Sequence, residues 1–590
     1  MFSYARLLCS ASLFTTALLC CQPAIAQTSP ASKPGTISGR VVNESGRPLP
    51  DAGVTLARWG SMYMDSTPTD SIRTTTDREG KFEVSGLQPV IYQVFAFLQG
   101  YAPLLRNLDD TQTSLYRVGD SVTLVLTKGG VITGTVTNQA GEPIVGVNVR
   151  AVMIRAANYS LFPYGPMGGA DLTDDRGIYR IYGLPEGTYV VSAGGGGEMR
   201  YSEVDPFDKD IPTYAPASTR DTAQEIIVRA GAETNGVDIQ YRGGSGHSVS
   251  GSARGPEGAQ PLHFGIFLAS ANGSGLQTRA SQGPNDRGFM LQGVDDGDYN
   301  ITAISQRPDG ELMFSAAKQV KVSGADVTGV ELVVQPLSSV TGRVILEESK
   351  TTECADKQRP ILTETLISAQ NQESVISARN KGIDILQLPF RFLGLTASAD
   401  ERGNVLLKNL PSGRYYFTTQ YFAKDWYLKS LSLMPPETAS TKAGKPLDPA
   451  RTWTTLKPGD RLNGLTITLA QGAASLRGHI ALSKGETLAE KLYVYLLPAE
   501  KEAADNPLRF YGAAVTADGK VALNNLAPGR YWVFAQGVTD ESESTLLRLR
   551  LPDEKAYRTK LRREAETMKT EIELKPCQQV ADLKVPVSEN

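Results

Sequence analysis

One alternating pattern recurs five times along the 590-residue chain and limits what the chain can fold into. Its clearest copy is TDDRGIYRIYGLPEGTYVVSA, residues 173–193: a polar turn, an alternating strand, a short connection, a tyrosine and a second alternating strand. Apolar residues spaced by two point to one face of a strand, and a short connection that contains Gly favours a tight turn. The pattern therefore predicts five β-hairpins. Their tyrosines are Tyr92, Tyr189, Tyr299, Tyr415 and Tyr531.

A strand that contains a fixed glycine precedes each hairpin, and a Gly-led turn with a final strand follows most of them. The fixed glycines are Gly39, Gly134, Gly251, Gly342 and Gly478. A glycine inside a strand usually marks a bulge or the close approach of another backbone. In the fifth copy, MKTEIELKP (residues 568–576) is expected to form the closing strand. The charged residues 554–569 before it are expected to form either a short helix or a solvated strand edge.

Regular turns and the absence of strand–helix–strand alternation favour antiparallel β-sandwiches. A chain of this length is too long for one hydrophobic core. The predicted fold is all-β: five tandem antiparallel β-sandwich domains after a signal peptide. The predicted boundaries are 1–26 for the signal peptide, then 36–127, 130–242, 247–336, 339–470, and 474–590 with a C-terminal tail.

The N-terminus has the features of an export signal. Arg6 precedes a mostly apolar run over 7–19, and Ala24 and Ala26 form an A-x-A cleavage site. Cleavage would place the mature chain in the periplasm or outside the cell, with no membrane span. A membrane anchor is the alternative, although the apolar run is short for a span. A lipoprotein reading would use Cys20 or Cys21, which lack a small preceding residue.

The mature chain keeps two cysteines, Cys354 and Cys577. In an exported protein they could form one disulfide between adjacent domains. Two buried free thiols are the alternative. The net charge of −3 includes no basic field, so nucleic acid is not an expected partner.

The motifs together resemble the carboxypeptidase regulatory-like domain. The resemblance rests on TISGRVVNESGRPLPDAGVTL and TTTDREGKFEVSGLQPVIYQV in the first repeat, and on VITGTVTNQAGEPIVGVNVRA with the 173–193 stretch in the second. It implies a prealbumin-like, immunoglobulin-like sandwich, also described as a carbohydrate-binding-like fold. It also implies a non-catalytic accessory module, common in exported bacterial proteins, and no peptidase activity.

The sequence offers no recognisable catalytic, metal or cofactor motif. His247, His263 and His479 lie outside H-x-x-E and H-E-x-x-H patterns. No G-x-S-x-G elbow and no phosphate-binding glycine loop occurs. Acidic clusters at 171–175 and 295–298 suit turns, because Asp side chains bond nearby backbone amides. Calcium binding by these loops is the alternative.

Exposed aromatic residues in loops are the best binding candidates, because sugars stack on such rings and proteins use them as interface anchors. The candidates are Trp59, Tyr63, Tyr159, Phe162, Tyr164, Trp426 and Tyr427. Alternatively, these rings fold back over the rims of the sandwiches. The expected function is non-catalytic binding or scaffolding at the cell envelope, with a glycan or protein ligand and no cofactor. A pure spacer or adhesin, and a hydrolase with an unrecognised site, are the competing readings.

Overall fold

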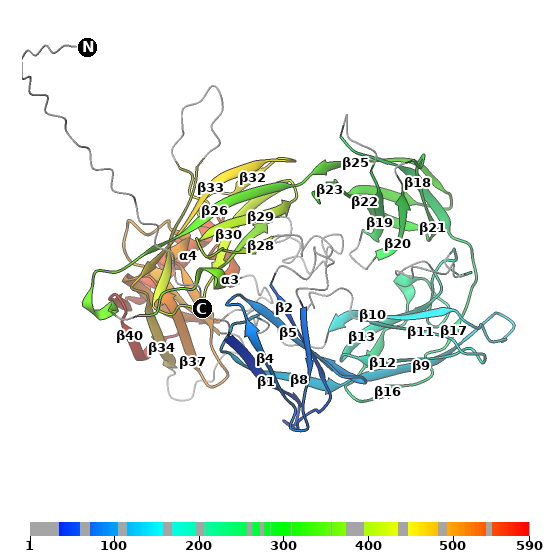
Figure 1. The fold of residues 1–590 in the computed structure, drawn as a ribbon, viewed down its shortest axis with the longest axis horizontal. Coiled ribbons are helices and arrows are strands. Elements are labelled where there is room, and N and C mark those ends of the chain that lie inside the picture. Colours follow the sequence, from blue (N-terminus) through cyan, green and yellow to red (C-terminus); the bar gives the residue numbers. More distant parts are fainter. Residues whose placement is uncertain are drawn as a thin grey trace, which may run out of the picture.

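The structure is a computed structural model of the chain. It describes residues 35–59, 71–103, 115–156, 168–195, 206–207, 209–256, 262–271, 276–283, 285–307, 310–355, 357–372, 395–434, 446–481, 492–537 and 545–588. Strand pairing sorts the strands of these residues into nine sheets, which pack around five large hydrophobic cores. We call the strands around each core a unit and number the units first to fifth in chain order (Figure 1). The predicted all-β sandwich class is confirmed. The predicted domain boundaries stay a prediction, because strand pairing does not show where one folding unit ends.

The first unit has two four-stranded sheets, in the orders β4-β1-β8-β6 and β3-β2-β5-β7. Their strands are β1 (Gly35–Asn43), β2 (Gly53–Arg58), β3 (Ser71–Thr75), β4 (Lys81–Leu87), β5 (Tyr92–Phe97), β6 (Tyr101–Pro103), β7 (Leu115–Tyr116) and β8 (Ser121–Lys128). The second unit has sheets β12-β9-β16, with β17 also on β9, and β11-β10-β13-β14, with β15 also on β13. Its elements are β9 (Gly130–Thr137), β10 (Asn148–Ala156), β11 (Gly168–Leu172), β12 (Ile178–Leu184), β13 (Gly187–Ala193), β14 (Thr213–Tyr214), η3 (Arg220–Thr222), β15 (Ile226–Val228), β16 (Glu233–Thr234) and β17 (Ile239–Gln240).

In the third unit, β23 pairs with both β22 and β25 and joins the two layers into one eight-stranded sheet. Its strands are β18 (His247–Arg254), β19 (Phe264–Ser270), β20 (Leu276–Gln282), β21 (Phe289–Val294), β22 (Gly297–Gln306), β23 (Leu312–Ser315), β24 (Lys318–Val322) and β25 (Val327–Pro336).

The fourth unit repeats the plan of the first, with sheets β29-β26-β33-β31 and β28-β27-β30-β32. Its elements are β26 (Ser338–Glu347), η4 (Thr352–Cys354), η5 (Leu362–Glu364), β27 (Leu366–Asn371), β28 (Thr396–Ser398), β29 (Asn404–Leu410), β30 (Gly413–Gln420), β31 (Trp426–Leu433), β32 (Thr454–Leu456) and β33 (Arg461–Gln471).

The fifth unit has sheets β37-β34-β40 and β36-β35-β38-β39. Its elements are β34 (Ala474–Ala481), β35 (Leu492–Pro498), η7 (Pro507–Arg509), β36 (Tyr511–Ala514), β37 (Lys520–Leu526), β38 (Gly529–Gly537), α3 (Thr545–Arg548), α4 (Lys555–Met568), β39 (Glu571–Leu574) and β40 (Gln579–Pro586).

One strand assignment in the fifth unit is wrong. The segment MKTEIELKP contains β39, which pairs with β38 and does not close the sheet of the first strand. That place belongs to β40, which runs parallel to β34. Of the two expectations for residues 554–569, the helix is correct: α4 buries Arg558, Leu561 and Ala565 against the outer face of the β35–β38 sheet.

The fixed glycine of each repeat is required by a strand that runs parallel to it, which the sequence pattern does not indicate. In every unit the first strand pairs in parallel with the last. A Cβ at Gly39 would lie 2.2 Å from the carbonyl oxygen of Val122, and one at Gly342 would lie 2.4 Å from that of Leu465. The backbone of the neighbouring strand cannot move away to make room for a Cβ atom. The predicted close approach of another backbone is therefore confirmed.

The repeated tyrosine closes the turn of each hairpin. Its hydroxyl donates to the carbonyl oxygen four residues earlier in all five units, at 3.1 Å for Tyr92, 2.8 Å for Tyr189, 2.9 Å for Tyr299, and 2.7 Å for both Tyr415 and Tyr531. The ring of each tyrosine packs in the core of its unit. One side chain therefore serves both the core and the turn, as in the tyrosine corner of immunoglobulin-like sandwiches.

The first four units make a closed circuit of contacts (Figure 1). The side chain of Gln99 in the first unit donates to the hydroxyl of Tyr182 in the second at 3.3 Å. The backbone N–H of Ile211 in the second unit donates to Gly244, in the connection to the third unit, at 2.9 Å. Arg461 of the fourth unit forms an ion pair with Glu311 of the third. The fourth unit then contacts the first, and we call this last contact the closing junction. The fifth unit lies beside the fourth (Figure 1).

Candidate functional site at the closing junction

The closing junction joins parts of the chain that are far apart in sequence. Ile91 and Leu115 of the first unit and Leu366 of the fourth are buried together. Trp59 and Phe422 pack against these three side chains. Beside this cluster, the hydroxyl of Thr363 donates to the carbonyl oxygen of Pro89 at 2.5 Å, across 274 residues of sequence. The contact combines a small apolar cluster with one directional hydrogen bond.

Each half of the cluster comes from a place where strand alternation breaks. Leu366 and Ile367 are adjacent and both buried, at 2% and 0% exposure. Ile367 belongs to the core of the fourth unit, whereas Leu366 belongs to the junction. Ile91 directly precedes the core tyrosine Tyr92 in the same way. Two adjacent buried apolar residues at the start of a strand point to opposite faces, and this is the sequence signal that could have indicated a second buried surface.

A charged group lies next to the apolar cluster. Glu364 is buried, and its Oε2 lies 3.7 Å from Nη1 of Arg117 of the first unit. The Arg117 guanidinium stacks over the ring of Phe422 at 4.6 Å from the ring centre. The backbone N–H of Arg117 donates to Asp120 Oδ2 at 2.7 Å. Burial raises the pKa of Glu364 to about 6, because the attraction of Arg117 is too weak to offset the loss of water, and nearby Asp120 also raises it.

A cleft of about 820 Å³ lies between the two units at this junction. One wall is formed by Arg58, at the end of β2, and the β4–β5 connection, 88–90. The other wall comes from the fourth unit and carries Thr341, Thr363, Ser398, Asp400, Glu401 and Asn404. Its volume suits a small ligand. The lining offers hydroxyl, amide and carboxylate groups and one guanidinium, and it contains no histidine or cysteine.

The structure places Trp59 and Tyr427 at contacts between units. Trp59 packs in the closing junction. Tyr427 packs against the core of the fifth unit, and burial raises the pKa of its hydroxyl. These two rings contact other parts of the same chain. Tyr63, Tyr159, Phe162 and Tyr164 lie outside the described residues, as does the predicted signal peptide, so their assignments stay predictions.

Trp426 is wrong as an exposed binding residue. Its side chain is 0% exposed and belongs to the core of the fourth unit. Its indole N–H donates to the carbonyl oxygen of Gln358 at 3.1 Å. The physical reason is a bulge in β31 between Leu428 and Ser430, which shifts the pairing register. The bulge hides the alternation that would have marked the tryptophan as a core residue.

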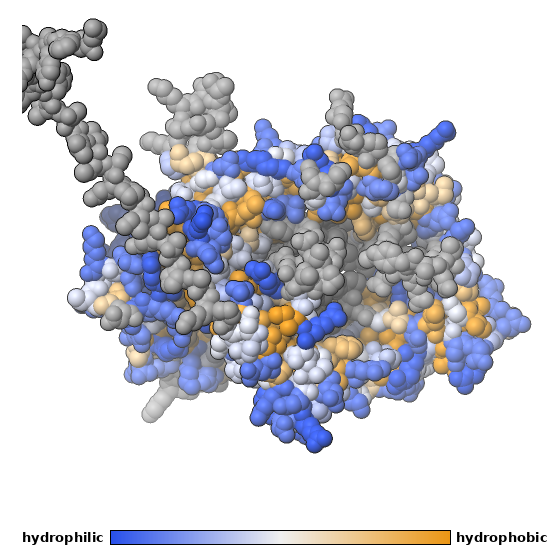
Figure 2. Space-filling model, in the orientation of Figure 1, coloured by the Kyte–Doolittle hydropathy of each residue, from blue (hydrophilic) through white to orange (hydrophobic). Residues whose placement is uncertain are grey.

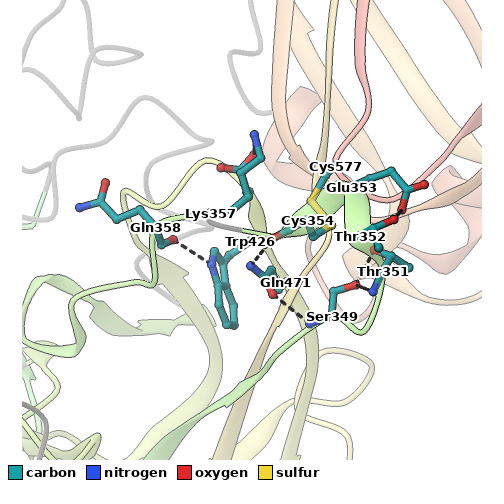
Figure 3. The surroundings of a disulfide bond; sticks show 11 residues. Ser349, Thr351, Thr352, Glu353, Cys354, Lys357, Gln358, Trp426, Gln471 and Cys577 are labelled. Carbon is teal, nitrogen blue, oxygen red and sulfur yellow. Dashed lines mark hydrogen bonds and ion pairs between the residues drawn. A yellow bond between two sulfur atoms is a disulfide. The ribbon is translucent and has the colours of Figure 1, made fainter.

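Cys354 and Cys577 form a disulfide between the fourth and fifth units, with their Cα atoms 5.6 Å apart (Figure 3). Figure 3 shows Gln471 beside this bond, where its amide donates to the carbonyl oxygen of Cys354 at 3.1 Å. Asn525 of the fifth unit donates to the carbonyl oxygens of Ala423 and Trp426 of the fourth unit, each at 2.7 Å. We call this set of contacts the disulfide junction.

The acidic clusters serve turns in the described residues. Asp174 Oδ1 accepts from the N–H groups of Arg176 and Ile178 at 2.9 and 2.8 Å. Asp400 and Asp77 accept in the same pattern. The hydrogen bond from the Arg176 side chain, more than any other contact, lowers the pKa of Asp174. Within the part of the chain that the structure describes, no three potential metal-ligating side chains come together.

The three histidines lie at separate places in the fold. His247 lies at the start of β18, where its Nε2 is 3.4 Å from Asp296 Oδ1. His263 is exposed before β19, and His479 lies on β34 opposite Lys520. In the described ranges, no helix has the length and apolar character needed to cross a membrane.

Comparisons with known proteins find one family and several solved structures. Residues 36–119 match the model of the carboxypeptidase regulatory-like domain. A comparison with curated proteins finds no match. Among solved structures, the Bacillus anthracis TIE protein is 12% identical at a TM-score of 0.13, with 52% of this chain and 51% of that chain covered. The chain thus spans about half the length of that protein.

Two pilins are also similar in part. GBS52, the minor pilin of Streptococcus agalactiae, is 13% identical at a TM-score of 0.18, with 35% of this chain and 94% of that chain covered. BcpA, the major pilin subunit of Bacillus cereus, is 11% identical at a TM-score of 0.13, with 52% and 99% covered. The family match falls on the first unit. The sequence of the first unit, residues 36–119, is therefore similar to the carboxypeptidase regulatory-like domain, and this match covers less than half of the chain.

Proposed function

We propose that the chain is an exported, non-catalytic scaffold that holds binding surfaces in a fixed geometry at the cell envelope, with a glycan or protein ligand. The observation that carries this proposal is the closing junction. A spacer needs contacts only between consecutive units. In this chain the first and fourth units bury Ile91 and Leu366 in one cluster, and the Thr363 hydroxyl donates a hydrogen bond to the Pro89 carbonyl oxygen. Bringing together residues so far apart in sequence costs chain entropy. The contact that offsets this cost holds surfaces of the first and fourth units in a fixed relative position.

Export is supported by two observations of different kind. The N-terminal residues carry the pattern of a signal peptide. The Cys354–Cys577 bond belongs to the disulfides that persist in oxidising compartments and are rare in the cytosol. Both support a location in the periplasm or outside the cell.

The scaffold role is tested by comparing the shape and binding of the intact chain with those of a chain opened at the closing junction. Small-angle scattering of the full chain, with its disulfide intact, should give a compact particle. A variant with Leu366→Asp should give a larger radius of gyration and bind less tightly any ligand found in a panel of polysaccharides and envelope proteins. An intact chain that scatters as an extended string would overturn the scaffold proposal and favour a spacer or adhesin.

Enzymatic activity is the second outcome that would overturn the proposal. The intact chain should not hydrolyse polysaccharides, peptides or esters from a broad panel. Turnover that disappears when Glu401 or Asp400 of the cleft is replaced by Ala would instead place an active site in the closing junction.

A further inference from the structure

The outer face of the β3-β2-β5 sheet in the first unit has two rows of side chains beyond the closing junction. The strand register places Phe95 and Arg73 on either side of Thr55. In the next row it places Phe97 and Thr75 on either side of Gly53. Directly opposite residues on adjacent strands share one face. The face therefore presents two aromatic rings, two hydroxyls and a guanidinium around a glycine that leaves room above the sheet.

This face is open at one end and covered at the other. Ala57 and Gln93, which form the row nearest the closing junction, are only 2% and 3% exposed. Phe97, at the other end, is 72% exposed, and Arg73 and Thr75 are also exposed. Figure 2 shows a mostly hydrophilic surface with an apolar patch over β2 and β5. The buried part of this face thus ends before Phe97.

The fold itself does not require an aromatic residue at these positions. When the five repeated tyrosines are aligned, the residue equivalent to Phe95 is Ser192, Thr302 or Thr418 in the second to fourth units. In the fifth unit it is Phe534, which is 0% exposed because α4 packs over that face. The first unit has Phe95 there, which is half-buried, and Phe97 two residues further on, which is 72% exposed.

The charge of the face favours an anion. None of the strands β2, β3, β5 and β7 contains Asp or Glu. Arg73 is exposed on β3 and has no ion-pair partner among the residues that the structure describes. A guanidinium binds a carboxylate through two parallel hydrogen bonds, and an aromatic face accepts an apolar ring surface. Hydroxyls such as those of Thr55 and Thr75 both donate and accept.

We propose that the open end of this face, formed by Phe97, Arg73, Thr55 and Thr75, binds an acidic polysaccharide that contains uronic acid units. The apolar face of a sugar ring would stack on Phe97, the uronate carboxylate would accept from Arg73, and sugar hydroxyls would bond to the threonines. This site rests on the proposed binding function of the scaffold and gives that function a ligand class.

The test measures binding of the full chain, with its disulfide intact, to oligogalacturonate and alginate oligomers by calorimetry, with a neutral β-glucan for comparison. The intact chain should bind an acidic oligomer, and more weakly at high salt because exposed charges are screened. Phe97→Ala should weaken binding at least tenfold. Arg73→Gln should remove the preference for acidic over neutral oligomers, and Arg73→Lys should restore part of it.

A matched control separates this site from general loss of surface apolar groups. Met290 of the third unit is 57% exposed, and Met290→Ala should leave binding unchanged. Both Phe97 and Met290 are exposed, so neither substitution should unfold the chain. The proposal is overturned if the intact chain binds no acidic oligomer, if it prefers the neutral glucan, or if Phe97→Ala binds as well as the intact chain. Any of these results leaves the compact shape expected of the scaffold untouched, so the two proposals fail separately.

Discussion

The two junctions of the fourth unit differ in kind. The disulfide junction holds the fifth unit through a covalent bond and two hydrogen bonds from Asn525. The closing junction holds the first unit through three buried apolar side chains, one hydrogen bond from Thr363 and a distant ion pair of Glu364. The disulfide junction stays covalently closed in an oxidising compartment. The closing junction is non-covalent, so it can open and close reversibly. The circuit of the first four units should therefore open at the closing junction first.

The largest effect should come from breaking the unit that both junctions share. In Gly342→Val, the new side chain would overlap the carbonyl oxygen of Leu465, 2.4 Å from the position of its Cβ. We expect loss of several kcal/mol, in the range of severe core overpacking and strain, and loss of both junctions. Limited proteolysis should then cut within the fourth unit. If the variant melts like the intact chain, the close approach of the parallel strands is not needed.

Removing the disulfide should be the next largest effect. With Cys354→Ser and Cys577→Ser, we expect the stability of the fourth and fifth units to fall by about 2–5 kcal/mol. Denaturant unfolding of the intact chain with a reductant should match the double variant. The Asn525 bonds should keep the two units together in native buffer, so separation of the units without denaturant would show that the covalent bond alone makes this junction.

Opening the closing junction should change the overall shape of the chain more than the stability of its individual units. Leu366→Asp would bury an unpaired carboxylate between the units, yet Leu366 lies outside the core of its own unit. We expect a larger radius of gyration by scattering and nearly unchanged melting of the individual units. Leu447 of the same unit is 49% exposed, and Leu447→Asp is the control that should keep the compact shape.

The smallest effect should be a pH dependence of closure. Burial raises the pKa of Glu364 from 4.5 to about 6 in the closed form. Opening the junction would expose this carboxyl to water and remove the raised pKa, so the closed form should bind the proton more tightly than the open form. The added preference for closure is fully present below pH 4.5 and is lost as pH rises through about 6. Glu364→Gln should remove this dependence when compactness is followed by scattering from pH 4 to 8. An unchanged pH profile in the variant would assign the titration to another group.

The sequence predicts the parts of the fold that depend on local chemistry. Tyr189 and its four equivalents can be recognised because each lies at a fixed distance after a turn and at a core position of a strand. Gly134 can be recognised because a glycine inside a strand indicates a bulge or the close approach of another backbone. The register bulge in β31 conceals the burial of Trp426. The parallel pairing of first and last strands could not be predicted, because it joins residues about one unit apart without a local signal.

The candidate site was less predictable than the fold for the same reason. Trp59 is a candidate interface residue in the sequence, but the cluster it packs against includes Leu366 of another unit, and no periodicity reports a contact between two surfaces. Glu364 and Arg117 look like ordinary solvated charges in sequence. Phe97 alternates as a strand residue should, and only the strand register and its 72% exposure show that it lies at the open end of the outer face.

The closing junction should hold the first and fourth units together in solution. This expectation is tested most directly by a distance measurement between spin labels at Glu83→Cys on β4 and Lys408→Cys on β29, both exposed, in a chain whose native cysteines remain bonded. The closed ring predicts a single narrow distance distribution that broadens in Leu366→Asp. A broad distribution in the otherwise unaltered chain, no different from that of Leu366→Asp, would contradict it.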